Sequence, residues 1–188
     1  MKFLSLAIVL VTLSMSMTIA QTAKSNTKME GKDAEALNEL YTAKRHPQEY
    51  CLAQNIFYES RTDNLAGQAA VADVVLNRVA MKKYPSTVCE VVREGPISKW
   101  WKEEKGKEVP IKHRCQFSWY CDGKPDDQPE GDKWRQAQEI AYRMYHFDYL
   151  RGISEGATHY HATYVDPKWN RNMHLIGRIG LHIFYVER

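Results

Sequence analysis

The stretch Cys51-Leu-Ala-Gln-Asn-Ile-Phe-Tyr-Glu-Ser-Arg61 places an acidic residue, Glu59, at the end of an apolar helical pattern. At about 100° per residue, Leu52, Ile56 and Glu59 fall within an arc of roughly 60° on a helix. The Glu59 carboxyl is therefore expected at the edge of the face that packs inward. Burial raises the pKa of a carboxyl, which is what a general acid acting near neutral pH needs. The alternative is a glutamate held by the following Ser-Arg pair at the helix end.

Helical patterns surround this stretch. Pro47 begins a predicted helix that ends near residue 60, because proline suits the first turn of a helix. A second helix is predicted from Ala66 to about Lys82, and its apolar residues cover most of the circumference, as in a buried central helix. Asp73 and Asn77 mark its polar side, and we interpret both as structural. Residues 134–147 predict a third, amphipathic helix.

Extended structure is predicted mainly near the C-terminus, beyond Gly156, where the sequence becomes aromatic in residues 158–164 and 177–185. Residues 115–121 are predicted as a strand and turn. A short helix or extended piece is expected from Val88 to Arg93. Since helices dominate and the strands are few and short, the fold class is α+β.

Residues 94–114 are charged and are predicted to be irregular, with Trp100 and Trp101 inside them. Two adjacent tryptophans in a polar loop either stack on sugar rings or form a simple packing lid. The sequence leaves both interpretations open.

The N-terminus has the pattern of a secretory signal. Lys2 precedes an apolar run, and the small residues Thr18 and Ala20 predict cleavage after residue 20. An uncleaved or slowly released anchor is the alternative, although the apolar run is short and diluted by Ser and Thr. Residues 21–46 are predicted as a polar linker with a short helix around 33–45, and residues 47–188 as one catalytic domain. The expected location is secreted or periplasmic.

The charge of the mature chain argues against nucleic acid as a partner. The chain has 26 Lys and Arg against 23 Asp and Glu, and removing residues 1–20 takes one Lys, which leaves 25 − 23 = +2. Lys and Glu are also interspersed rather than clustered. No second stretch is long and apolar enough to predict a membrane span, and we expect a monomer.

The four cysteines, Cys51, Cys89, Cys115 and Cys121, form an even set, which suggests disulfides in an exported protein. Three pairings are possible. We favour Cys115–Cys121 as a local bridge and Cys51–Cys89 as a long-range one. A structural zinc site is the rival interpretation, but the spacings lack the usual Cys-x-x-Cys pairs.

Several motifs occur together in a characteristic order. They are Cys51-Leu-Ala, Phe57-Tyr-Glu-Ser-Arg61, Gly67-Gln-Ala-Ala-Val-Ala, Val75-Leu-Asn-Arg78, Tyr84-Pro-Ser-Thr-Val-Cys89, Cys115-Gln-Phe-Ser-Trp-Tyr-Cys-Asp-Gly123, Gly156-Ala-Thr-His-Tyr-His161 and Ile179-Gly-Leu-His-Ile-Phe-Tyr185. This set closely resembles the SleB/CwlJ-type cell wall hydrolases over roughly residues 48–187. The resemblance implies a lysozyme-like α+β fold, mainly helical with a small antiparallel β region. It also implies that the chain cleaves the MurNAc–GlcNAc bond of peptidoglycan glycan strands.

The catalytic glutamate of that family corresponds to Glu59. The family often continues as Glu-x-Arg-Gly-Glu, whereas this chain has Thr-Asp63 at the last two positions. A conventional glycosidase needs a second carboxylate, about 5 to 10 Å from the first. The candidates are Asp63, Asp73, Asp122, Asp126 and Asp127, and none is convincing from its position. A single-acid lytic transglycosylase without cofactors therefore fits better than a muramidase-type hydrolase.

Substrate contacts are expected from polar and aromatic residues near that acid: Gln116, Phe117, Ser118, Tyr160 and His161, with Trp119 as an alternative stacking residue. Alternation along a strand puts His159 and His161 on one face and Tyr160 on the other, so we expect only one of these faces to line the cleft. The alternative for each is core packing or a satisfied histidine. A metal site at the two histidines, and with it an amidase or peptidase, is a rival that lacks a third ligand at convincing spacing. A non-catalytic peptidoglycan-binding module is a further rival.

Overall fold

The computed structural model describes residues 42–126 and 131–188, and five α-helices and a three-stranded sheet lie within them. The elements are α2 (Pro47–Ser60), α3 (Leu65–Val79), α4 (Val88–Val92), α5 (Lys99–Lys105), the 3-10 turn η1 (Ser118–Cys121), α6 (Asp132–Phe147), β1 (His159–Ala162), η2 (Lys168–Asn172), β2 (Met173–Ile179) and β3 (His182–Glu187). The α+β class, mainly helical with a small antiparallel sheet, is confirmed. Among the described helices, none has the length and apolar character to cross a bilayer.

Helix α2 is the centre of the helical part. It begins at Pro47 and ends at Ser60, as the sequence predicts, and it packs against α3, α4 and α6. Leu52 and Ile56 are fully buried, so the face predicted to pack inward does so. Glu59 lies on the same face in the last turn of the helix, where it borders a pocket instead of the core.

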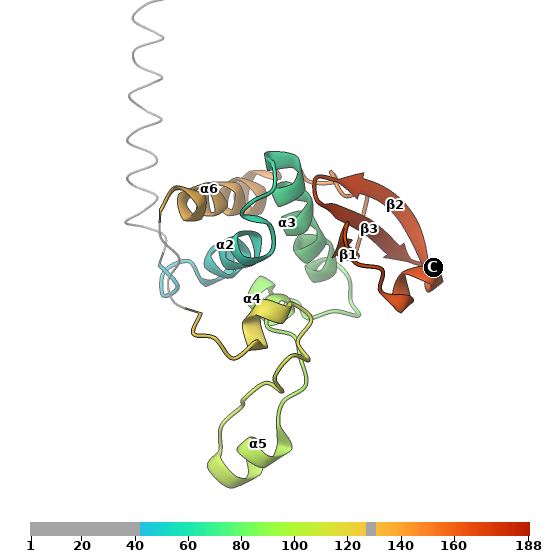
Figure 1. Ribbon diagram of the computed structural model, residues 1–188. Helices are drawn as coiled ribbons and strands as arrows, with labels where there is room; N and C mark the ends of the chain where they lie inside the picture. The colour runs from blue at the N-terminus through green and yellow to red at the C-terminus, as the bar shows by residue number, and fades with distance from the viewer. Residues whose placement is uncertain (1–41, 127–130) are drawn as a thin grey trace, which may run out of the picture. The chain divides into compact units, whose positions relative to one another are not determined.

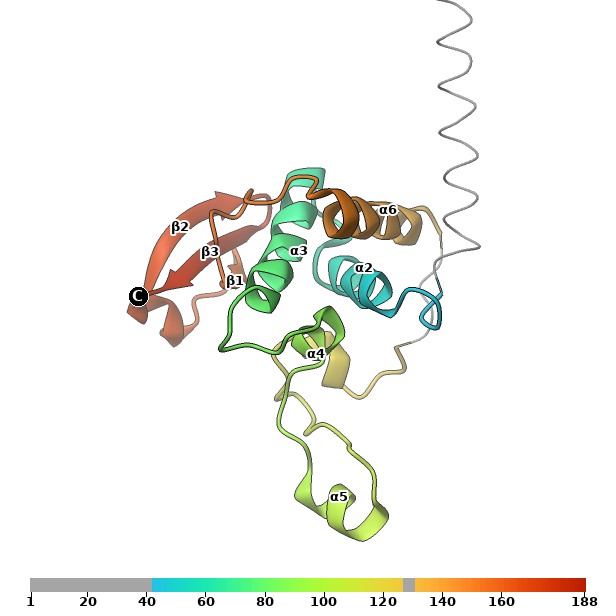
Figure 2. The same ribbon diagram turned by 180° about the vertical axis from the view of Figure 1, so that it is seen from behind.

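Helix α3 separates two apolar clusters. Asn64 caps its start, because the side-chain Oδ1 accepts a hydrogen bond from the Gly67 N–H at 2.9 Å. Ala69, Ala72 and Val75 pack with α2 and α6, whereas Val71 and Val74 pack with Phe184 of the sheet. In Figures 1 and 2, α3 accordingly runs between the α2/α6 pair and the three strands. The helix ends at Val79, three residues before the predicted end.

The sheet has the order β1-β3-β2, and both pairings are antiparallel. Strand β1 is therefore at an edge, where Tyr160 pairs with Phe184 of the central strand. Figure 1 shows β2 and β3 as the two long strands of the sheet, with the shorter β1 on the other side of β3. The edge position of β1 becomes important because a pocket opens beside it.

Two sequence predictions of secondary structure are wrong. Residues 115–121 are not a strand and turn; they form a bend followed by η1. The reason is the bridge between Cys115 and Cys121, whose Cα atoms are 6.0 Å apart, whereas six extended residues would span about 20 Å. The predicted irregular segment 94–114 contains helix α5, and none of its residues is buried.

Both favoured disulfides are confirmed. Cys51–Cys89 joins α2 to α4, with 5.2 Å between the Cα atoms, and Cys115–Cys121 closes the short loop that carries η1. The zinc alternative is therefore wrong, because all four thiols are used in bridges. The predicted signal and most of the linker, with its helix, lie outside the described residues; residues 43–45 form a turn.

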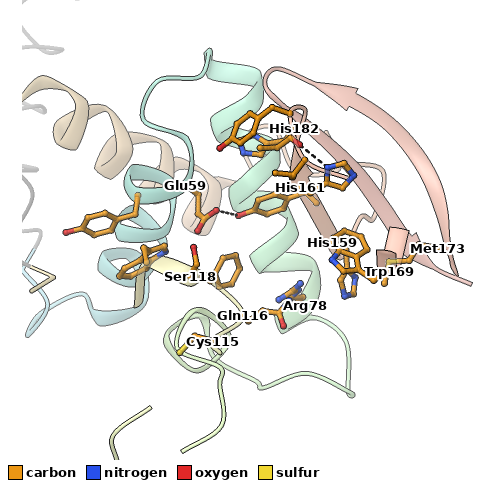
Figure 3. Close-up of a pocket in the computed structure, with 17 residues that line it drawn as sticks. Glu59, Arg78, Cys115, Gln116, Ser118, His159, His161, Trp169, Met173 and His182 are labelled. Carbon is orange, nitrogen blue, oxygen red and sulfur yellow. Dashed lines mark hydrogen bonds between the residues drawn. The ribbon is translucent and has the colours of Figure 1, made fainter. Parts of the chain in front are cut away.

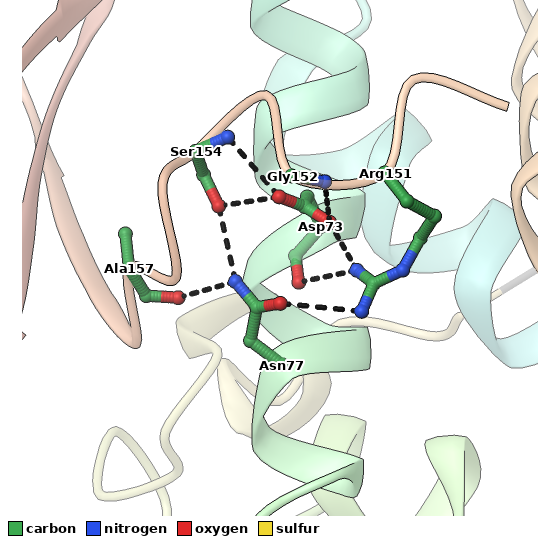
Figure 4. A network of polar contacts seen from close by, with 6 residues as sticks. All are labelled: Asp73, Asn77, Arg151, Gly152, Ser154 and Ala157. Atoms are coloured by element: carbon green, nitrogen blue, oxygen red, sulfur yellow. Dashed lines mark hydrogen bonds and ion pairs between the residues drawn. The ribbon is translucent and has the colours of Figure 1, made fainter. Parts of the chain in front are cut away.

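Asp73 and Asn77 organise a buried polar network (Figure 4). Asp73 is fully buried, pairs with Arg151, and accepts hydrogen bonds from the backbone N–H groups of Gly152 and Ser154. Asn77 donates to the Ser154 hydroxyl and to the carbonyl of Ala157. The network anchors the segment between α6 and β1 to α3, in agreement with the structural interpretation of this pair.

Candidate active site

Glu59 lies in the last turn of α2 and lines a pocket of about 790 Å³. Burial raises the pKa of its carboxyl from 4.5 to about 7, and a hydrogen bond from Tyr160 opposes part of that rise. The Tyr160 hydroxyl donates to Oε2 of Glu59 at 3.3 Å (Figure 3). A carboxyl with this pKa holds its proton through much of the neutral range and can give it up to a bound molecule.

The pocket is formed by four stretches of the chain that lie far apart in sequence. They are the end of α2 with Tyr58 and Glu59; Arg78 on α3; residues 115–119 around η1; and residues 159–182, of which His159, Tyr160, His161, Ala162, Tyr164, Val165, Trp169, Met173 and His182 line it. Glu59 is the one acidic residue among these described lining residues. One wall therefore comes from the helical part and the other from the sheet side.

Tyr160 connects the two walls. Its ring packs edge-on against His182 with the centroids 5.1 Å apart and lies 5.6 Å from Phe184, so its position is set by the sheet. Burial, together with the nearby charge of Glu59, raises the pKa of its hydroxyl well above the ordinary value. The hydroxyl therefore stays protonated and acts toward Glu59 as a donor.

Comparison with known proteins identifies the family of the chain. The sequence pattern of the cell wall hydrolases matches residues 62–185 of the chain. The chain belongs to the cell wall hydrolase family.

Two solved structures are similar to this cell wall hydrolase. One is the catalytic domain of the germination-specific lytic transglycosylase SleB from Bacillus anthracis, with 24% identity, a TM-score of 0.52, and coverage of 74% of this chain and 93% of that one. The other is the catalytic domain of the Bacillus cereus SleB protein, with 25% identity, a TM-score of 0.46, and coverage of 74% and 91%. The first shows a shared fold. A comparison with curated protein sequences gave no significant match.

The substrate-contact residues predicted from the sequence all line the pocket of this cell wall hydrolase: Gln116, Phe117, Ser118, Tyr160 and His161. Their surroundings differ. Gln116 and Ser118 are exposed, whereas Phe117 is 4% exposed and belongs to the core cluster. The predicted contact roles remain a proposal, but the residues do lie on one cavity.

The expectation that only one face of β1 lines the cleft is wrong. His159, Tyr160 and His161 all line the pocket, because β1 is a short edge strand and the pocket extends around its free side. His161 is nevertheless held by the protein: its Nδ1 contacts the carbonyl of Ala162 at 2.9 Å, and its Nε2 contacts the Tyr185 hydroxyl at 3.0 Å. A carbonyl can only accept, so Nδ1 carries a proton in this contact.

The candidate second carboxylates lie elsewhere. Asp63 is buried behind the pocket lining, where its Oδ2 accepts from the Leu181 N–H at 2.9 Å and lies 3.4 Å from Nδ1 of His182, without hydrogen-bond geometry. A Cβ at Gly67 or Gly180 would collide with this carboxyl, so both glycines are needed for its close packing. Asp73 is fixed by Arg151, and Asp127 lies outside the described residues. Among the described residues, no three His, Cys, Asp or Glu side chains form a group that could hold a metal ion.

Sequence reasoning did not assign a site role to Arg78 or Trp169, both of which line the pocket together with Tyr58. Tyr58 stacks on Trp119 with 4.6 Å between centroids, and Trp169 lies 5.6 Å from the rings of both His159 and His161. The sequence does mark Arg78 as unusual, because a charged residue on a helix that is apolar nearly all round needs a polar partner or a polar cavity. No such signal marks Trp169, since it lies in the short 3-10 turn η2, whose composition is ordinary.

Proposed function

We propose that this cell wall hydrolase is a lytic transglycosylase that cleaves the MurNAc–GlcNAc bond of peptidoglycan with Glu59 as its one catalytic acid. The observation that carries the proposal is the burial of Glu59, with a pKa of about 7, as the one acid among the described lining residues. Membership of the cell wall hydrolases supports the substrate, and the fold shared with a protein named as a lytic transglycosylase supports the reaction type.

In the first step, protonated Glu59 donates its proton to the glycosidic oxygen as the bond to C1 of MurNAc breaks. The GlcNAc 4-hydroxyl leaves as a neutral alcohol. Positive charge develops at C1 and the ring oxygen, and the carbonyl of the substrate's own 2-acetamido group can stabilise it. This assistance replaces the second carboxylate that a conventional glycosidase uses.

In the second step, the 6-hydroxyl of the same MurNAc attacks C1. The Glu59 carboxylate takes the hydroxyl proton, which restores the acid, and the product is 1,6-anhydro-MurNAc. No water is consumed. Tyr160 supports this cycle because its hydroxyl stabilises the carboxylate that exists between the two steps.

Binding of the glycan strand is assigned to the walls of the pocket. The exposed side chains of Gln116 and Ser118 can hydrogen-bond N-acetyl groups, while Phe117, Tyr160 and His161 shape the apolar surface beneath the sugar rings. Aromatic faces are common partners of such rings because they combine apolar area with little conformational freedom. These contacts require no cofactor.

The site of action is proposed to be outside the cytoplasm. Two disulfides and a peptidoglycan substrate both agree with export, as does the signal pattern in residues 1–20. Finding the full-length protein with its N-terminus retained in the cytoplasm would contradict this part of the proposal.

The deciding experiment is mass spectrometry of purified peptidoglycan digested by the wild-type protein and by Glu59→Gln. We expect anhydro-MurNAc ends from the wild type and a loss of about 100- to 10,000-fold in the variant, because the amide has no proton to transfer. Reducing MurNAc ends would mean a muramidase-type hydrolase, and released peptides would mean an amidase. A folded Glu59→Gln variant that binds strands and still cleaves them at the wild-type rate would exclude Glu59 as the acid.

A further inference from the structure

Arg78 is a buried cation on the wall of the pocket. It lies near the end of α3, is 2% exposed, and has its guanidinium over the rings of Tyr84 and Phe117, at 5.3 and 5.5 Å from their centroids. Its Nε donates to the carbonyl of Thr158 at 2.8 Å. These contacts hold the plane of the guanidinium in one orientation and leave the two Nη groups directed elsewhere.

No described carboxylate forms an ion pair with Arg78. Glu94 and Glu187 are close enough to raise its pKa, yet burial is the larger effect and lowers it. Glu187 is engaged by Lys83 and Tyr84, and Oε2 of Glu94 is buried without a hydrogen-bond partner. A buried charge without a carboxylate in contact with it is costly, so a cation kept in this state indicates a use for it.

The two Nη groups of Arg78 meet the side chain of Gln116. With the amide oriented to satisfy both residues, Oε1 of Gln116 accepts from Nη2 at 2.9 Å and from Nη1 at 3.2 Å. This is the paired arrangement in which an arginine binds a carboxylate, but here a neutral amide oxygen occupies it. Gln116 is exposed and lines the pocket beside Arg78, as Figure 3 shows, so its side chain has room to move aside.

We propose that Arg78 is the carboxylate-binding group of this pocket, and that a carboxylate of the substrate displaces the Gln116 side chain and pairs with both Nη groups. The inference rests on the proposed function and deepens it, because it predicts that the pocket prefers acidic glycan strands over neutral ones such as chitin. The carboxylate has two possible sources. One is the lactyl group of a MurNAc that has lost its peptide, and the other is a stem peptide.

The test is binding of three tetrasaccharides, measured by calorimetry with the full chain carrying Glu59→Gln to prevent turnover. They are a neutral GlcNAc oligomer, a peptide-free GlcNAc–MurNAc oligomer with free lactyl carboxylates, and the same oligomer carrying stem peptides. A charge-assisted pair predicts about tenfold or greater preference for an acidic probe over the neutral one. Preference for the peptide-free probe identifies the lactyl group as the source, and preference for the peptide-bearing probe identifies the stem.

Replacing Arg78 itself would disturb the core, so the test instead changes its exposed partner Gln116. Gln116→Glu changes an exposed side chain and places a carboxylate of the protein on Arg78, so the preference for acidic probes should fall about tenfold. Gln136→Glu on α6 adds the same charge away from the pocket lining and should leave the preference unchanged. Equal affinity for all three probes, no binding of any, or a preference that survives Gln116→Glu would each overturn the inference. The cleavage products of the wild type, scored separately, test the proposed function.

Discussion

At the scale of single residues, the two acids of α2 have different surroundings, although both are removed from bulk water, Glu49 fully and Glu59 in part. Glu49, 5% exposed, has the ring Nε2 of His146 at 2.7 Å and Nδ1 of His46 at 3.4 Å, so partners able to carry positive charge are at hand. Glu59 instead accepts a hydrogen bond from the neutral hydroxyl of Tyr160. Burial without a cation is what keeps the proton on Glu59, and it makes the protein less stable whenever that proton must leave.

The first prediction concerns stability and pH. The pKa of Glu59 is raised from 4.5 to about 7 on folding, so the folded state holds the proton more tightly than the unfolded state does. The contribution of Glu59 to wild-type stability should therefore fall as pH rises from about 4.5 to 7, by at most about 3 kcal/mol, and this fall should stop above pH 7. Glu59→Gln removes this dependence, so its advantage over the wild type should grow across that range in urea unfolding. Glu49→Gln is the matched control on the same helix, and it should show no such gain. An advantage of Glu59→Gln that is constant with pH would contradict the assigned cause.

The second prediction concerns Tyr160. Its hydrogen bond lowers the pKa of Glu59, so Tyr160→Phe should raise that pKa and move the alkaline limb of the activity profile to higher pH. The rate at the optimum should fall about tenfold, because the carboxylate formed after proton transfer loses a donor. The measurement is a pH–rate profile on soluble strands. A lower rate with an unmoved alkaline limb would reduce Tyr160 to a structural residue.

At the scale of elements, sequence patterns predict helices well and assembled surfaces poorly. The bounds of α2 follow from Pro47 and from apolar spacing, because both are local signals. The strand predicted for residues 115–121 conflicts with the bridge predicted between Cys115 and Cys121, because a bridge across six residues excludes an extended chain. Glu59 could be singled out because its setting lies in its own helix. Arg78 could not be placed on the pocket, since periodicity does not tell which side of a buried helix faces a cavity.

The third prediction tests the network that joins α3 to the segment before β1. Asp73→Asn keeps the shape of the side chain but leaves Arg151 without its buried counter-ion, so unfolding should become easier by about 3 kcal/mol. Activity per folded molecule should stay close to that of the wild type, because Asp73 does not line the pocket. Asp122→Asn is the matched control: its carboxylate accepts from the Lys124 N–H in a loop and has no buried partner among the described residues, so the urea midpoint should fall much less. A folded Asp73→Asn protein without activity would make Asp73 a candidate catalytic acid again.

At the scale of the whole molecule, the site depends on the joint position of two apolar clusters. One cluster fixes α2 and with it Glu59, the other fixes the sheet and with it Tyr160, and α3 contributes buried residues to both. The disulfide between Cys51 and Cys89 strengthens the first cluster by tying α2 to α4. The geometry between acid and tyrosine is therefore a property of the packed molecule, which explains why no short motif predicts it.

Helix α5 stands outside this arrangement. It extends away from the other helices and the sheet in both views, and neither Trp100, 56% exposed, nor Trp101, 38% exposed, lines the pocket. The two rings contact each other edge to face with centroids 4.9 Å apart. Neither a packing lid over the core nor a contact inside the pocket agrees with these positions, so a role in cleaving the bound sugar is not expected.

The fourth prediction follows from this separation. Replacing Lys99–Lys105 by a short Gly-Ser linker removes no buried side chain and retains the bridge between Ile97 and Pro110, so the melting temperature should change little. The rate on soluble strands should also be retained, because Glu59, Tyr160 and Arg78 keep their surroundings. The contrasting variant is Trp119→Ala, which removes a buried ring that donates to Asn55 at 3.1 Å and should cost about 3 to 5 kcal/mol. If the linker variant lost activity on soluble strands as well, the catalytic unit would have to include α5. Loss of activity on insoluble cell walls alone would instead assign helix α5, with its two exposed tryptophans, to attachment of the enzyme to its polymeric substrate.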